Sequence, residues 1–202
     1  MSLAPAELQR LAGEAERIAA AAGSAILAVY DANYTIAHKD DRTPLTEADL
    51  AAHRLIVEGL RRLTPSLPVL SEESLDVPYA ERAGWTRYWL VDPLDGTREF
   101  IKKNGEFTVN IALIDGERPV LGVVHAPVGG ALWGAWRDGG AYRRDVAGAA
   151  PRRLRTRAPA EPLVVAGSRS HGSEREAGLL ARLGAVEKLA LGSSLKFCRI
   201  AE

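Results

Sequence analysis

The residues with the clearest chemical potential lie at the end of a short apolar segment. Residues 89–91 (Trp-Leu-Val) predict a buried strand, and two carboxylates, Asp92 and Asp95, follow it with a Pro-Leu pair between them. Pro93 fixes the backbone of the predicted turn, and Gly96 permits a tight bend directly afterwards. A hydrophobic core does not require this pair of acids, so the pattern indicates a functional site.

A second apolar segment ends in acid in the same way. Val69 and Leu70 predict a short strand, and Glu72 and Glu73 follow it closely. Two strands that end in carboxylates indicate a shared site for a hard cation, because Mg²⁺ binds carboxylate, carbonyl and water oxygens and bridges to substrate phosphate. A short helix that begins at Thr97 would add backbone N–H donors for that phosphate.

Each segment alone has a plainer explanation. The dipeptide Asp95-Gly96 is common in turns, and Glu72 and Glu73 could lie in a solvated loop or at a helix N-terminus. Together the two segments favour the metal site. An EF-hand loop is excluded, because it needs oxygen ligands at positions one, three, five and twelve with glycine at six, and a loop that starts at Asp92 has its next acid and its glycine at positions four and five.

The composition limits the classes of protein to which the chain can belong. It has 202 residues, 47% of them hydrophobic, with 26 acidic and 26 basic side chains. That length can bury a sizeable core, and the charge balance argues against a general nucleic-acid binder. The single cysteine, Cys198, excludes an internal disulfide framework and fits a reducing compartment; its simplest role is that of a small buried apolar residue.

The chain shows no sign of membrane insertion or export. No apolar stretch approaches the roughly 20 residues that span a bilayer, and Glu7 and Arg10 interrupt the region where a signal peptide would be apolar. We therefore expect a soluble intracellular protein.

Two amphipathic helices are expected before the acidic segments. The first, from about Ala6 to Tyr30, has apolar residues at three- and four-residue steps: Leu8, Leu11, Ala15, Ile18, Ala22, Ile26 and Val29. The second should begin at Thr46, whose hydroxyl can cap the first turn, and should end near Leu63. Asp49, three residues after Thr46, could be only a capping acid.

Hairpins are expected in the middle of the chain. The segments 107–114 and 119–125 predict one pair of strands, and 131–136 with 140–143 predict another, each pair joined through an Asp-Gly turn. Such hairpins indicate an antiparallel sheet rather than a parallel nucleotide-binding sheet.

The composition changes between Val146 and Pro162, a stretch rich in Ala, Pro and Arg. We expect a boundary there between an N-terminal subdomain, residues 1–150, which carries the metal site, and a partial C-terminal subdomain, residues 151–202. The arginines between 143 and 157 are most simply solvated, with a phosphate-steering surface as the alternative.

The C-terminal subdomain should alternate strand and helix. Strands are expected at 163–166 and 186–189, with a helix at 173–183 between them. Alternation of this kind indicates an α/β layer.

Taken together, these segments resemble the inositol-monophosphatase superfamily of Mg²⁺-dependent, Li⁺-sensitive phosphatases. The resemblance covers essentially the whole chain and is carried by KDDRTPLTEAD from Lys39, LSEES from Leu70, WLVDPLDGT from Trp89 and GSSLKFC from Gly192. It implies an α/β (α+β layered) fold of alternating helix and sheet layers. Within the superfamily, GSSLKFC and FIKKNGEFTVNIALI from Phe100 are most similar to the bacterial 3′(2′),5′-bisphosphate nucleotidases. That branch removes the 3′-phosphate of adenosine 3′,5′-bisphosphate, a by-product of sulfate activation, and leaves AMP.

The resemblance also implies roles for individual residues. Two or more Mg²⁺ ions would be held by Glu72, Asp92, Asp95 and the carbonyl of Leu94. Asp49 and Thr97, with Glu72, would form the catalytic set that holds and polarises the attacking water. Metal ions at these carboxylates can lower the pKa of that water and neutralise charge on the phosphate oxygens.

The implied substrate-binding residues lie partly in other segments. Backbone amides of Gly96 and Thr97 would bind the phosphate, while His171, Ser193 and Lys196 would contact the rest of the nucleotide. The full implied set is Glu72, Leu94, Asp95, Gly96, Thr97, His171, Ser193 and Lys196. His171 could equally lie on a loop surface, and Lys196 could be a solvated lysine.

The expected partner is a small nucleotide bisphosphate, with no nucleic-acid polymer, and the oligomeric state stays open. By resemblance the location is the cytoplasm or the cytoplasmic face of the inner membrane. Members of the superfamily continue past the Ala-Glu that ends this sequence with a Trp-Asp-x-Ala-Ala-Gly segment, whose aspartate is a further metal ligand. We therefore expect an incomplete second subdomain, and little turnover from these residues alone.

Three other functions compete with the nucleotidase. One is a phosphatase of inositol phosphates or other small phosphomonoesters, and another is a catalytically inactive metal- or ligand-binding module. The third, a phosphatase with an aspartyl-phosphate intermediate, is disfavoured because its aspartates are usually one residue apart, whereas Asp92 and Asp95 have two residues between them.

Overall fold

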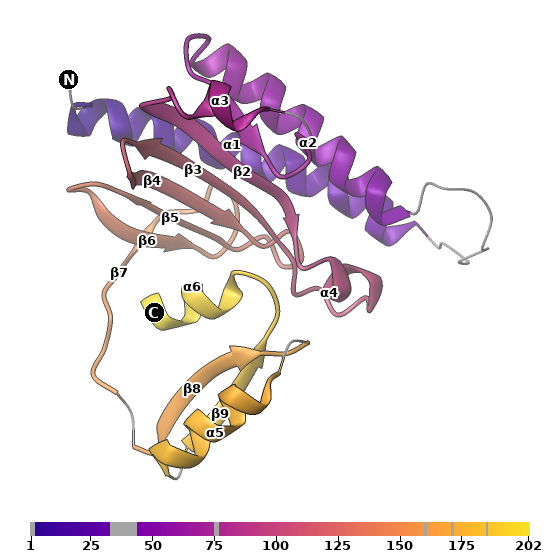
Figure 1. The fold of residues 1–202 in the computed structure, drawn as a ribbon, viewed down its shortest axis with the longest axis vertical. Coiled ribbons are helices and arrows are strands. Elements are labelled where there is room, and N and C mark those ends of the chain that lie inside the picture. Colours follow the sequence, from indigo (N-terminus) through magenta and orange to yellow (C-terminus); the bar gives the residue numbers. More distant parts are fainter. Residues whose placement is uncertain (1–2, 33–43, 75–76, 160, 171, 185) are drawn as a thin grey trace.

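A computed structural model describes residues 3–32, 44–74, 77–159, 161–170, 172–184 and 186–202. Two long helices lie side by side on one face of a seven-stranded sheet, and a smaller two-stranded unit lies on the opposite side (Figure 1). The last helix lies between the two parts. No helix among the described residues is both long enough and apolar enough to cross a membrane.

The helices largely follow the predicted pattern. The long ones are α1, Pro5–Asp31, and α2, Pro44–Leu63. Proline suits the first turn of a helix, and α2 begins at Pro44, so the predicted start at Thr46 is wrong. The shorter helices are α3, Tyr79–Arg82; α4, Thr97–Ile101; α5, Glu174–Leu183; and α6, Leu195–Ala201, of which α3 and α6 were not predicted.

The large sheet is mainly antiparallel, as the hairpin signals predicted. Its strands lie in sequence order: β1, Val69–Ser71; β2, Arg87–Asp95; β3, Thr108–Asp115; β4, Arg118–His125; β5, Leu132–Trp136; β6, Gly140–Arg144; and β7, Arg152–Leu154. Only β1 and β2 pair in parallel. The sequence did not predict β7, which lies within the expected boundary segment.

The smaller unit has the expected alternation. Its strands β8, Leu163–Ser168, and β9, Val186–Leu191, pair in parallel and are connected through α5. The Ser173 side chain accepts a hydrogen bond from the Glu176 amide at 3.2 Å, which caps α5. The division of the chain near residue 150 stays a prediction.

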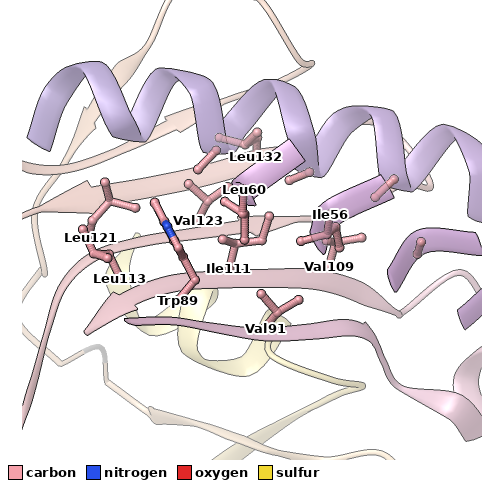
Figure 2. Packing of buried hydrophobic residues seen from close by; sticks show 14 of the residues in the cluster. Ile56, Leu60, Trp89, Val91, Val109, Ile111, Leu113, Leu121, Val123 and Leu132 are labelled. Atoms are coloured by element: carbon pink, nitrogen blue, oxygen red, sulfur yellow. The ribbon is translucent and has the colours of Figure 1, made fainter. Parts of the chain in front are cut away.

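The core lies between the two long helices and the sheet. Alternate residues of β2 to β5 point toward the helices, and Trp89, Ile111, Leu113 and Leu121 are at most 2% exposed (Figure 2). The Trp89 indole donates a hydrogen bond to the Thr64 hydroxyl at 2.8 Å, so its polar atom has a partner. This packing fixes the register of β2, and with it the direction of the acids at its end.

Helix α6 is held over the other face of the sheet by Glu202, the residue that follows its last turn. The Glu202 carboxylate accepts hydrogen bonds from Trp133 Nε1 at 3.0 Å and from Arg143 Nη1 at 2.7 Å. Both donors come from strands of the large sheet, β5 and β6. The start of α6 is thereby directed toward the last residue of β2 and the first residues of β3.

The core packing of α2 gives a stability prediction. Leu60 is completely buried, whereas Leu55 on the same helix is 40% exposed. Leu60→Ala should lower the free energy of unfolding by about 3 kcal/mol, because it leaves a cavity as well as losing buried apolar area. Leu55→Ala should cost less than about 1 kcal/mol. Denaturant unfolding of both variants checks this, and equal losses would contradict the assigned core face of α2.

Candidate active site

The parallel pairing of β1 and β2 brings the two acidic segments together. Ser71 lies opposite Val91, and the Glu72 amide donates to the Val91 carbonyl at 3.0 Å. Glu72 therefore leaves β1 beside Asp92. The carboxyl ends of parallel strands meet at one edge of a sheet, which is why two short acidic motifs far apart in the sequence form one cluster.

The sequence suggested a turn at Pro93, but strand β2 does not turn there. It continues to Asp95, and a β-bulge shifts its register against β3, where Asp92 lies opposite Asn110 and Asp95 opposite Thr108. A bulge redirects the side chains that follow it, so Asp95 is aimed by an irregularity within the sheet. The predicted turn is therefore wrong, although both carboxylates remain at the end of β2.

Burial, reinforced by the charges of neighbouring acids, raises the pKa of two of these carboxylates. Burial raises the pKa of Asp92 to about 8, with further contributions from Asp95, Glu72 and Asp49. Burial also raises the pKa of Asp49 to about 7, reinforced by Glu73 and Glu72. Asp49 thus belongs to the acidic cluster, and its interpretation as a capping acid is wrong.

The donor set fits a cation. The Oδ1 atoms of Asp49 and Asp92 are buried without a hydrogen-bond partner. No three acidic, histidine or cysteine side chains of the described ranges have the arrangement of a formed metal centre. Carboxylates with no positive charge between them separate or share protons, and a bound cation would reverse both effects. The side chain of Leu94 is buried in the core, so only its backbone can serve the site.

A hydrogen-bond network fixes Asp95, and its three other members were not predicted. The Ser194 hydroxyl donates to Asp95 Oδ2 at 2.8 Å, and Asn110 Nδ2 lies 3.4 Å from the same oxygen. Asn110 also donates to Ser194 at 3.0 Å, while the Thr108 hydroxyl donates to Asn110 Oδ1 at 3.1 Å. Asn110 is an amide within an otherwise apolar strand, and that signal could have identified it.

His53 was also missed. It follows Asp49 by one turn of α2, and its Nδ1 lies 2.8 Å from the hydroxyl of the buried Ser71. This hydrogen bond joins α2 to the end of β1, directly before Glu72. It holds the Asp49 face of the helix against the acidic segment.

Five of the eight residues implied for substrate binding line one cavity of about 440 Å³, whereas Glu72 and Leu94 do not line it. Asp95, Gly96 and Thr97 form one wall, and Ser193 and Lys196 form another. The cavity is completed by residues that were not predicted: Arg98, Glu99, Ser168 and Phe197. Phe197 also borders a second hollow of about 660 Å³, whose polar edge includes Glu72 and Asp92.

Within the cavity, the predicted residues differ in their surroundings. Thr97 is exposed to the cavity side, whereas the Ser193 hydroxyl is buried without a partner, on a backbone with a φ of 46°. The Lys196 ammonium donates to the Ser193 carbonyl, so this lysine is not simply a solvated one. His171 lies outside the described residues. Cys198 is buried, as expected, and burial raises the pKa of its thiol to about 12.

Comparison with known proteins identifies the family and the fold. The sequence profile of the inositol monophosphatase family matches residues 7–202. The chain belongs to this family. Its members are metal-dependent, in agreement with the buried carboxylates described above.

Among curated proteins, the chain is similar to the 3′(2′),5′-bisphosphate nucleotidase CysQ of Escherichia coli K12. The two are 50% identical over 189 residues, which cover 92% of this chain and 74% of that protein. The CysQ protein of Salmonella typhimurium LT2 is 51% identical over the same length. The matches therefore extend over both parts of the fold.

Solved structures give the same result. The crystal structure of CysQ from Bacteroides thetaiotaomicron has a TM-score of 0.87 at 39% identity and covers 96% of this chain and 77% of its own. SuhB of Mycobacterium tuberculosis has a TM-score of 0.75 at 27% identity, with 96% and 73% covered. The predicted fold class, with alternating helix and sheet layers, is confirmed.

The raised pKa of Asp92 predicts how the stability of the metal-free protein depends on pH. Between its ordinary pKa of 3.8 and about 8, folded Asp92 keeps a proton that the unfolded chain has lost, so stability falls as the pH rises through this range. Asparagine cannot ionise and removes this dependence. With chelator present, the melting temperature of Asp92→Asn should exceed that of the wild type at pH 8, and the difference should shrink toward pH 4.

Asp31→Asn provides the control, since that side chain is exposed at the end of α1. It should follow the wild type at every pH. A pH dependence of Asp92→Asn identical to that of the wild type would contradict the raised pKa of Asp92 in the fold.

Proposed function

We propose that the chain is a metal-dependent 3′(2′),5′-bisphosphate nucleotidase that removes the 3′-phosphate of adenosine 3′,5′-bisphosphate and leaves AMP. The observation that carries the proposal is the pair of buried, unpartnered oxygens on Asp49 and Asp92, beside the cavity that Asp95, Gly96 and Thr97 line. The similarity to the CysQ proteins, which are named for this activity, supports the choice of substrate.

The acidic residues supply the metal site in this proposal. Glu72, Asp92, Asp95 and the Leu94 carbonyl would hold two or more Mg²⁺ ions. When bound, the ions lower the pKa of water and offset the charge on the phosphate. Ser194 and Asn110 keep Asp95 oriented through their hydrogen bonds to Oδ2, as outer partners commonly do for metal ligands.

Asp49 and Thr97 would handle the attacking water. Asp49 has a pKa of about 7 in the metal-free cluster, so it can accept a proton near neutral pH. The Thr97 hydroxyl can orient the same water by accepting or donating a hydrogen bond. Glu72 raises the pKa of both Asp49 and Asp92 and would complete the catalytic set.

The cavity walls would divide the recognition of the nucleotide. The Gly96 and Thr97 amides lie at the start of α4 and would bind the reacting phosphate. Lys196 and Ser193 on the opposite wall would contact the remaining part of the nucleotide, together with His171. A lysine placed there offers a positive charge to a second phosphate.

A substrate panel tests the proposal. In the protein extended by the family's Trp-Asp segment, phosphate release from adenosine 3′,5′-bisphosphate should exceed release from inositol 1-phosphate at least tenfold, should require Mg²⁺, and should stop with chelator. Glu72→Gln should lower the rate at least about a hundredfold, since a neutral amide cannot replace a charged ligand. Its neighbour Glu73→Gln is the matched control and should lose much less.

Two outcomes would contradict the proposal. Preference for inositol 1-phosphate would assign the chain to another substrate. Absence of turnover on any phosphomonoester, with Mg²⁺ binding intact, would identify an inactive binding module.

The roles of Thr97 and Asp49 can be separated from structural roles. Thr97→Ala should lower kcat about a hundredfold while the Mg²⁺ activation constant stays within about twofold, because its hydroxyl acts on water rather than on metal. Asp49→Asn should lose activity per folded molecule without losing stability. Melting curves measured beside turnover check both, and a purely thermal effect of Asp49→Asn would remove it from the catalytic set.

A further inference from the structure

The two walls of the 440 Å³ cavity come from distant parts of the chain. Asp95 ends β2, and Gly96 and Thr97 follow it, while Ser193 and Lys196 follow β9, and Ser168 ends β8. The two walls therefore belong to different sheets. Recognition of a nucleotide that touches both walls requires contacts that fix their separation.

Glu106 contacts both walls. Its carboxylate accepts a hydrogen bond from the Gly192 amide at 2.8 Å, directly before Ser193. Its backbone carbonyl oxygen lies close to both loops. A Cβ added to Gly192 would be 2.7 Å from this oxygen, and a Cβ added to Gly96 would be 3.1 Å from it. The two loops thus approach one another, through Glu106, as closely as glycine allows.

Arg169 completes this contact from the smaller unit. Its Nε and Nη2 donate to the two carboxylate oxygens of Glu106 at 2.5 and 2.7 Å, in a bidentate pair. Nη2 also donates to the Ala190 carbonyl at 2.7 Å, and the Arg169 amide donates to Leu191 at 3.1 Å. One guanidinium therefore joins the end of β8, the end of β9 and the loop before β3.

The pair differs from an ordinary surface ion pair. Exposed pairs contribute little, because two long side chains must be ordered in water. Here the carboxylate also binds a backbone amide, and the guanidinium also binds a backbone carbonyl. Burial acts to raise the pKa of Glu106, but the hydrogen bonds from Arg169 and Gly192 outweigh it and hold that pKa below its usual value.

The residue after Arg169 is held by α4. The Ser170 hydroxyl donates to the buried Glu99 at 2.6 Å, and Arg98 Nη1 donates to the Ser170 carbonyl at 3.0 Å. Glu99 and Arg98 both line the cavity. Two successive residues are thus attached to the other wall of the cavity. Arg169 binds Glu106, whose carbonyl lies against the Gly96 loop, and Ser170 binds α4, which follows that loop.

We propose that Glu106 and Arg169 form a positioning pair, which holds the Ser193 and Lys196 wall against the Gly96 loop and thereby sets the affinity for the part of the nucleotide beyond the reacting phosphate. The proposal rests on the proposed function for its substrate. It assigns no chemical step to either residue. Its consequence is a site whose selectivity for a nucleotide over a small phosphoester depends on a contact outside the reacting centre.

Steady-state kinetics of Glu106→Gln and Arg169→Gln test the pair. Each should raise KM for adenosine 3′,5′-bisphosphate roughly tenfold, which is the scale of one charge-assisted hydrogen bond, with kcat and the Mg²⁺ activation constant within about twofold. KM for p-nitrophenyl phosphate, which lacks the nucleoside, should not change. The double variant should be no worse than either single one, because both remove the same contact.

Asp115→Asn is the matched control. It removes the carboxylate that pairs with Arg87 at 3.0 Å between β2 and β3. The side chains of Arg87 and Asp115 are 23% and 21% exposed, and they lie at the opposite end of those strands from the acidic cluster. It should leave both KM values unchanged. If Glu106→Gln raises KM for both substrates equally, or leaves both unchanged, the positioning role is overturned.

A second measurement keeps this result separate from that of the proposed function. Amide hydrogen exchange at residues 190–198 should accelerate in Glu106→Gln and not in Asp115→Asn, whatever the substrate. If the wild type does not hydrolyse the nucleotide but this exchange pattern is found, the proposed function fails while the pair still positions the wall. Unchanged exchange in Glu106→Gln overturns the pair itself.

Discussion

The structure depends on one electrostatic constraint, which is that partly buried carboxylates of the described residues lie close enough together to raise one another's pKa. Asp49 and Asp92 respond with pKa values near neutrality, and each leaves an oxygen buried without a partner. Such an arrangement is unfavourable for folding when the acids are ionised, because they repel one another. When the acids are protonated, they are poor metal ligands. A bound cation removes both penalties, so the cost of the cluster is tied to the metal chemistry of the family.

The rest of the fold provides the stability that this cluster lacks. The packing of α1 and α2 on the sheet fixes the register of β2 through Trp89 and its neighbours (Figure 2). A slip by one residue would turn Asp92 into the core and Trp89 out of it. His53 then joins α2 to β1 through Ser71, which brings Asp49 to the same edge. Apolar packing on one face of the sheet thus determines where the charges lie.

The sequence predicted much of this arrangement but not all of it. Apolar periodicity located α1, α2 and both hairpins, and two apolar segments ending in acid located Glu72, Asp92 and Asp95, since these signals are local. The bulge after Asp92 was predicted as a turn, because Pro and Gly signal either one. Asn110, Ser194 and His53 were missed because their roles arise from tertiary contacts: each is an ordinary polar residue until the fold places it beside an acid.

The same distinction applies to the two walls of the cavity. The Gly96 loop is positioned by β2 and by α4, which precede and follow it. The wall formed by Ser193 and Lys196 depends on contacts from elsewhere in the chain. Gly96 and Gly192 allow the close approach, since a Cβ at either position would meet the Glu106 backbone. Glycine permits the approach but cannot enforce it, and a charged, bidentate pair has the directionality to do so. Under the two proposals, the reacting centre and its selectivity would therefore rest on different physics: carboxylates whose charge a metal offsets in one, and hydrogen-bonded attachment between two sheets in the other.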